Sequence, residues 1–172
     1  MKYLLLIPLA LALLVALIAV VGALLPRDHV ATRSAVFHQP PAVLFAAVHD
    51  FSALPSWRSG LSSVEFLPPQ NGAVFYREHS KQGTVTYCVR EERPGEKLVL
   101  EIADQNLPYG GRWIFDIRAV PGGAELRITE QGFVKNVIFR CLARFAFGYT
   151  SAMEACLRDL GKKFGEQISV SP

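Results

Sequence analysis

The sequence lacks the short motifs by which many enzymes are recognised. It has no HxxxH or CxxC spacing of the kind that holds zinc, no phosphate loop, no dinucleotide fingerprint and no G-x-S-x-G elbow. The pairs Gly110-Gly111 and Gly122-Gly123 are isolated, which is typical of turns. We therefore expect neither a metal site nor a cofactor.

Cysteine is scarce and odd in number, which argues against a disulfide framework. Cys141 and Cys156 fall in one predicted helix, where fifteen residues separate them by roughly 22 Å. A disulfide needs Cα atoms within about 7 Å, so this pair is excluded. Cys88 lies on a predicted strand, and we expect all three to be free, inert thiols in apolar surroundings.

The chain has no large excess of positive or negative charge. The chain carries 18 Lys and Arg against 15 Asp and Glu, a net charge of +3. A nucleic-acid surface needs basic residues clustered on one face, and no such cluster is visible. We therefore expect no nucleic-acid partner.

Charge is missing altogether between Tyr3 and Leu25, a run of 23 residues, whereas a membrane-spanning helix needs about 20. We predict a single-pass transmembrane anchor within residues 1–26 and one soluble domain over residues 27–172. The alternative is a cleaved export signal, since residues 21–23 offer small side chains, but signal cores are usually about 7–15 residues long. The very short N-terminal tail is typical of a signal anchor and favours a domain on the non-cytoplasmic side of the membrane.

The soluble part predicts an α+β domain. Residues 30–38 favour a strand, and two short helices follow at 42–48 and 51–57. Helical spacing of apolar residues from about 137 to 167 predicts one long amphipathic C-terminal helix. Period-two alternation predicts six further strands between the helices, at 62–67, 73–79, 84–92, 97–102, 112–119 and 124–131.

This order of elements resembles the START-like or SRPBCC superfamily, the helix-grip fold of pollen allergens, lipid-transfer domains and polyketide cyclases. The likeness covers roughly residues 29–168. It is carried by the segments 40–45 and 51–57, the hairpin series and the helix at 139–165. The resemblance implies a curved antiparallel sheet of about seven strands wrapped on the long C-terminal helix. It also implies a cavity between them for lipids, sterols, polyketides or other apolar ligands.

Strand alternation directs several aromatic and polar side chains toward the predicted cavity. Glu130 continues the inward row that begins at Ala124, and Tyr87 is in phase with Val85. A carboxyl group in an apolar cavity has a raised pKa and can act as a general acid or base. Alternatively, Glu130 lies in solvent or pairs with Arg112. The candidate ligand-binding residues are Trp57, Phe66, Tyr76, Tyr87, Trp113, Phe115 and Glu130.

Three functions remain open at this point. We favour a non-enzymatic, membrane-tethered domain that binds a hydrophobic small molecule or lipid. The second is a cyclase- or hydratase-type enzyme that uses Glu130 and a pocket tyrosine such as Tyr87. The third is a protein-interaction module, which would present an exposed apolar patch instead of a cavity.

Overall fold

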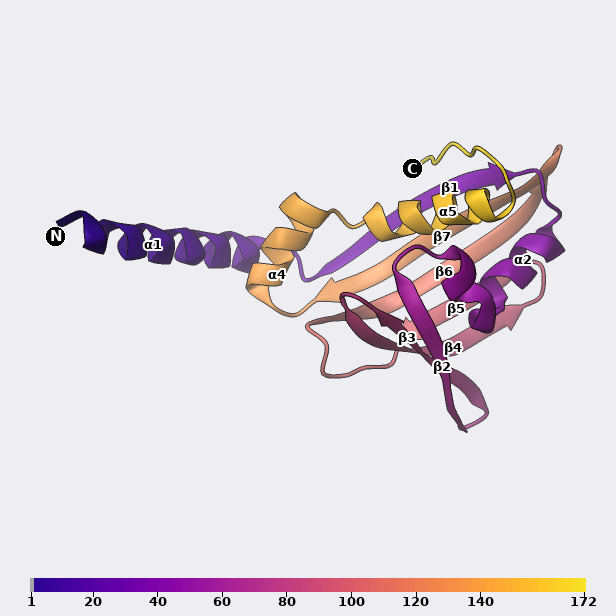
Figure 1. Cartoon of the computed structure of the whole chain (residues 1–172), viewed down its shortest axis with the longest axis horizontal. Helices are drawn as coiled ribbons and strands as arrows, with labels where there is room; N and C mark the ends of the chain where they lie inside the picture. Colours follow the sequence, from indigo (N-terminus) through magenta and orange to yellow (C-terminus); the bar gives the residue numbers. More distant parts are fainter. Residues whose placement is uncertain (1) are drawn as a thin grey trace.

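The N-terminal helix stands apart from the rest of the molecule. The computed structural model describes residues 2–172, and α1 (Lys2–Leu24) projects from one end of an α+β domain (Figure 1). The segment Ile7–Leu24 is long and apolar enough to cross a membrane, and almost none of it is buried. Only residues 25–27 separate α1 from the first strand.

Seven antiparallel strands form one curved sheet in the order β1-β7-β6-β5-β4-β3-β2. This confirms the sheet predicted from the alternation, although several strands begin earlier or end later than expected. The strands are β1 (Asp28–Phe37), β2 (Leu61–Gln70), β3 (Ala73–Ser80), β4 (Gly83–Arg93), β5 (Lys97–Ile102), β6 (Tyr109–Val120) and β7 (Gly123–Val134).

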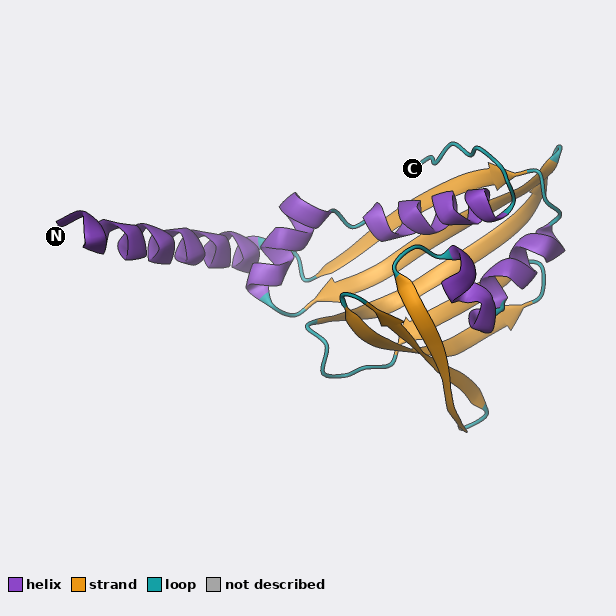
Figure 2. Ribbon diagram, in the orientation of Figure 1, coloured by secondary structure: helices purple, strands orange, loops and turns teal. Residues whose placement is uncertain are grey.

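The helices that cover the sheet lie on its concave face (Figure 2). Pro41 begins the first of them, as a proline at a helix start allows, and the Asp50 side chain caps the 3-10 turn by accepting from the Ala53 amide at 3.2 Å. The helical segments after α1 are α2 (Pro41–His49), η1 (Phe51–Ala53), α3 (Leu54–Trp57), α4 (Val137–Leu142), the π-helical turn η2 (Ala143–Phe147) and α5 (Ser151–Lys163).

The core fills the space between the sheet and the helices. Leu126 and Ile128 on β7 are fully buried, as the inward row predicted, and they belong to the same cluster as Met153, Leu157 and Leu160 of α5. Each fully buried side chain of this size stabilises the fold by about 1.5–3 kcal/mol. The C-terminal helix therefore covers part of the concave face.

The single long helix predicted over residues 137–167 is wrong, because the chain breaks at Gly148. This residue has φ of +73°, a conformation that glycine adopts without a steric penalty, and it ends η2 before α5 begins. The break places Cys141 and Cys156 in different helices, yet both are free thiols, as is Cys88. It also carries α4 away from the sheet to the end of α1 (Figure 1).

Candidate functional site

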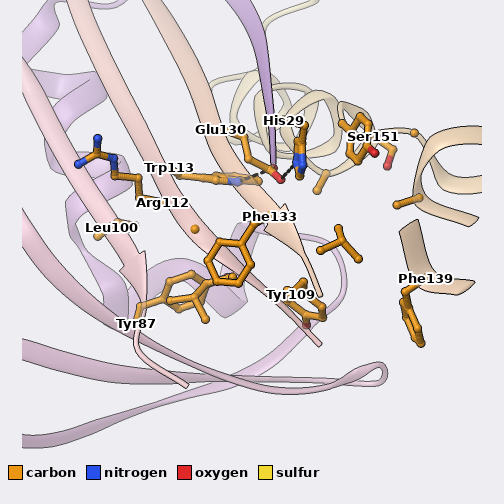
Figure 3. Close-up of a pocket in the computed structure, with 18 residues that line it drawn as sticks. His29, Tyr87, Leu100, Tyr109, Arg112, Trp113, Glu130, Phe133, Phe139 and Ser151 are labelled. Carbon is orange, nitrogen blue, oxygen red and sulfur yellow. Dashed lines mark hydrogen bonds and ion pairs between the residues drawn. The ribbon is translucent and has the colours of Figure 1, made fainter. Parts of the chain in front are cut away.

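The break between α4 and α5 leaves a cavity of about 330 Å³ at one end of the concave face. Its volume falls within the range of small-molecule sites, roughly 300–1,000 Å³. Most of its wall is apolar or aromatic, and its residues come from β1, β4 to β7, α4, α5 and the turns between (Figure 3). They include Tyr87, Leu100, Tyr109, Trp113, Phe133, Phe139 and Tyr149.

A hydrogen-bonded group of three side chains forms the polar part of this wall. Glu130 on β7 accepts from Trp113 Nε1 at 2.8 Å through one carboxylate oxygen and from His29 Nε2 at 2.9 Å through the other (Figure 3). Trp113 lies directly opposite Glu130 in the β6–β7 ladder. His29 stacks on Tyr149 with ring centroids 3.9 Å apart. The carboxylate is therefore held in one orientation at the cavity wall.

Gly132 provides the space in which His29 reaches Glu130. It lies opposite His29 in the β1–β7 ladder, and a Cβ at this position would fall 2.6 Å from His29 Nε2 and 3.0 Å from Glu130 Oε1. On β6, Gly111 lies opposite Gly132, and a Cβ added to Gly111 would lie 2.7 Å from Gly132 Cα. Only glycine at position 132 allows the His29–Glu130 contact as it stands.

A second hollow, of about 570 Å³, adjoins the first between the β3–β4 hairpin and α5. The two share the wall residues Tyr87, Tyr109, Ser151 and Ala152, so they are neighbouring parts of one concave surface. The second hollow is the more polar, with Arg58 and Glu78 on its wall.

Arg58 and Glu78 form an ion pair with a separation of 2.8 Å between Nη1 and Oε1. The Glu78 side chain is only 7% exposed, and burial raises the pKa of its carboxyl group while the guanidinium of Arg58 opposes that rise. Burial also raises the pKa of the Tyr76 and Tyr87 phenols, so both stay protonated at neutral pH. The Tyr76 hydroxyl is buried without a hydrogen-bond partner among the described residues.

Asp159 on α5 fixes the far edge of the second hollow. Its carboxylate accepts from the Ser59 amide at 2.7 Å and from the Ser59 hydroxyl, and it pairs with Lys162 at 2.9 Å. Burial acts against the charge, but these hydrogen bonds and the lysine lower the pKa of Asp159 below its ordinary value of 3.8. The charged form therefore ties α5 to the chain before β2.

We expect Asp159→Asn to lower the free energy of unfolding at pH 7 by about 1.5–3 kcal/mol, because hydrogen bonds to a charged group are lost. A group with a lowered folded pKa stabilises the fold above its unfolded pKa, and this contribution disappears as the pH falls through the folded value. Urea unfolding of wild type and variant at pH 7 and pH 3 measures the effect. The difference between them should shrink at pH 3, and an unchanged difference would contradict this account.

The structure brings together only some of the residues that the sequence suggested. Tyr87, Trp113 and Glu130 line the same cavity, and Tyr76 packs behind Tyr87 with ring centroids 5.5 Å apart. Glu130 is half-buried and bonded to His29 and Trp113, whereas Arg112 donates to Gln131 at 2.8 Å instead of to Glu130.

The other three predicted residues lie away from the cavity wall. Phe115 is buried in the core, and Trp57 packs against that core. Phe66 is 56% exposed and faces a separate hollow beside Phe51. Phe66 lies opposite the buried Tyr76 in the β2–β3 ladder and so shares its face of the sheet, but β2 is the edge strand, and Phe66 there stays exposed.

The site residues missed from the sequence include three polar side chains, His29, Arg58 and Glu78. Glu78 could have been found, because strand alternation places it on the same face of β3 as Tyr76. No sequence pattern points to His29 or Arg58. His29 lies at the start of β1, and Arg58 follows the four-residue helix α3. Within residues 2–172, no group of three or more His, Cys, Asp or Glu side chains is arranged to hold a metal ion.

Solved structures with this fold come from several bacteria. The aromatase/cyclase ZhuI from Streptomyces sp. R1128 superposes with a TM-score of 0.63 at 10% identity, covering 79% of this chain and 93% of that one. A START superfamily protein from Mycobacterium smegmatis gives 0.62 at 16%, covering 78% and 96%. A Rhodobacter sphaeroides protein gives 0.57 at 20%, covering 80% and 97%. Identities this low concern the fold alone.

Sequence comparison adds the family. No curated protein sequence matches the chain significantly. The family model described as polyketide cyclase / dehydrase and lipid transport matches residues 28–165, which include all seven strands and the whole of α5. This agrees with the START-like resemblance of the sequence and with the cavity beneath the C-terminal helix. The chain therefore belongs to the polyketide cyclase/dehydrase and lipid transport family, within the START-like superfamily.

Proposed function

We propose that this protein binds a hydrophobic small molecule or lipid in the 330 Å³ cavity and holds it beside a membrane. In this proposal residues 1–26 form the anchor, and residues 27–172 form the ligand-binding domain on the non-cytoplasmic side. The observation that carries the proposal is the cavity itself, whose wall is mostly apolar and contains one fixed polar group. Sites for small molecules commonly combine these two features.

The chemistry of the wall favours an elongated or ring-shaped apolar ligand with a polar end. Leu100, Phe133 and Phe139 offer apolar contact, whereas Tyr87 offers a neutral hydroxyl group whose pKa is raised by burial. At the polar part of the wall, Nδ1 of His29 is buried without a hydrogen-bond partner among the described residues and suits the polar end of a ligand. A fatty acid has both features and is a suitable probe.

The experiment uses the full chain in phosphatidylcholine vesicles that contain a fatty acid with a diazirine in its tail. After photolysis, mass spectrometry of the peptides should find crosslinks on the cavity strands as well as on α1. Leu100→Trp fills the cavity and should remove the crosslinks on β4 to β7. Val74→Trp adds the same indole to an exposed position on β3 and should leave them unchanged.

Crosslinks on α1 alone would overturn ligand binding and keep the anchor. Crosslinks on the cavity strands without any on α1 would overturn the anchor and keep the binding site. The α1 crosslinks thus serve as an internal control, because L100W does not touch that helix.

A second candidate function is catalysis by Glu130 with Tyr87, because both line the same cavity. His29 adds hydrogen-bonding capacity there, since its Nδ1 is buried without a partner among the described residues. In a cyclase- or hydratase-type reaction Glu130 would move a proton while the Tyr87 hydroxyl orients the substrate. A binding protein returns its ligand chemically unchanged, so incubation with an α,β-unsaturated acyl probe, which a hydratase would convert, separates binding from hydration.

A further inference from the structure

The end of α1 is fixed to the domain by the buried side chain of Arg140 on α4. Its guanidinium donates to the backbone carbonyl oxygens of Gly22 at 3.2 Å and Leu25 at 3.0 Å. It also donates to the carbonyl oxygens of Val134, the last residue of β7, and of Lys135. The last carbonyl groups of a helix lack partners within the helix, and a cation near them is favourable. Arg140 therefore joins α1, α4 and the end of β7.

Close contact between backbones sets the depth at which α4 meets α1. A Cβ on Gly22 would lie 1.8 Å from the carbonyl oxygen of Val137, so any side chain at this position is excluded. Val137 begins α4, and Gly22 lies in the last turn of α1. The start of α4 is thus level with the end of the apolar helix (Figure 1).

The surface beside this junction is both apolar and basic. Ile138, Phe139 and Phe145 are 38%, 45% and 69% exposed, which is unusual for large apolar side chains so close together. The basic side chains Arg27, Lys135 and Arg144 are also exposed there. Apolar residues that enter the acyl region, accompanied by Lys and Arg that reach the head groups, are typical of segments lying in a membrane interface.

We infer that α4 and η2 (Val137–Phe147) lie in the head-group region of the bilayer that α1 crosses, with the cavity mouth facing that bilayer. The inference rests on the proposed anchoring of α1. A spanning helix needs about 20 apolar residues, and α1 has few to spare. Its last turn must therefore lie at the membrane boundary, and α4, which contacts that turn, lies at the same depth.

This placement has a consequence for the ligand. Phe139 and Ala143, from the same segment, line the cavity together with Gly148 and Tyr149 (Figure 3). One segment thus provides both the membrane contact and one side of the cavity mouth. An apolar ligand can then pass between the bilayer and the cavity without crossing water, which avoids the loss of about 25 cal/mol for each Å² of apolar surface exposed.

The test compares two exposed phenylalanines at different ends of the domain. Phe145→Trp places an indole in η2, and Phe66→Trp places one on β2. Each full-length variant is reconstituted in vesicles of phosphatidylcholine and phosphatidylglycerol, with or without bromine on the acyl chains. We expect the emission of F145W to shift to the blue and to lose intensity with brominated lipid. F66W should change no more than the wild type, whose Trp57 and Trp113 supply the same background in both variants.

Flotation of the vesicles in a density gradient separates the possible outcomes. If the chain floats but F145W is quenched no more than F66W, α4 and η2 do not contact the bilayer and the inference fails while the anchor stands. A blue shift without quenching by brominated lipid means that protein covers Phe145, as in a second copy of the chain, and also overturns the inference. If the chain does not float, both the anchor and the inference fail.

Discussion

Replacing Arg58 with methionine should lower the free energy of unfolding by about 3–5 kcal/mol, because it leaves the Glu78 carboxylate buried without its partner. Methionine is similar to arginine in length and keeps the apolar contacts of the side chain. Urea unfolding of the detergent-solubilised chain, followed by tryptophan emission, measures the change.

The pH dependence of this loss identifies its cause. Burial already raises the pKa of Glu78 above its ordinary value of 4.5, and removing Arg58 takes away the charge that opposes the rise. A group with a raised folded pKa stabilises the fold when protonated, and this contribution is lost as the pH rises through the folded value. The deficit of Arg58→Met should therefore be larger at pH 8 than at pH 5.

A double variant provides the control. Arg58→Met combined with Glu78→Leu removes both charges and should recover most of the lost stability, since buried ion pairs can often be replaced by apolar residues at little cost. A double variant as unstable as the single one, or a deficit independent of pH, would mean that Arg58 acts through packing and not through Glu78.

The fold could be predicted from the sequence because its signals are local. Alternation of apolar and polar residues identified the strands, and the row from Ala124 to Ile128 pointed inward as expected. The prediction of one helix over residues 137–167 was wrong for a physical reason. The helical spacing of apolar residues continues across Gly148, but the backbone at Gly148 has a positive φ. Helical periodicity describes the positions of apolar side chains. It does not predict the backbone conformation of a glycine within the periodic segment.

The candidate site was harder to predict because much of it lies where the strands extend beyond their predicted ends. β1 begins two residues before the predicted strand and so includes His29, while β6 and β7 continue through Gly111 and Gly132. Glycines weaken a strand pattern and favour turns, so the strands predicted from the sequence stop short of these residues. The contact between His29 and Glu130 also joins residues 101 positions apart, which no local pattern reveals.

A further loss of stability, which is coupled to ligand binding, is expected at Gly132. We expect Gly132→Ala to lower the free energy of unfolding by about 1–3 kcal/mol, the usual range for overpacking a filled site. The added methyl group would lie 2.6 Å from Cε1 and Nε2 of His29, so the imidazole must move away from Glu130. The variant should also reduce fatty-acid crosslinking on the cavity strands, because the displaced ring disturbs the polar wall.

A double-mutant cycle with His29→Ala tests whether the imidazole is the obstacle. Removing the ring takes away the two nearest atoms and leaves Glu130 Oε1, at 3.0 Å, as the third, and a carboxylate freed from His29 can shift by a few tenths of an ångström. Gly132→Ala should therefore be nearly neutral in the His29→Ala background, which gives a coupling energy of about 1–3 kcal/mol between the two positions. An equal loss in both backgrounds would show that the alanine strains the β6–β7 backbone near Gly111 instead, and that His29 and Glu130 form their contact without depending on Gly132.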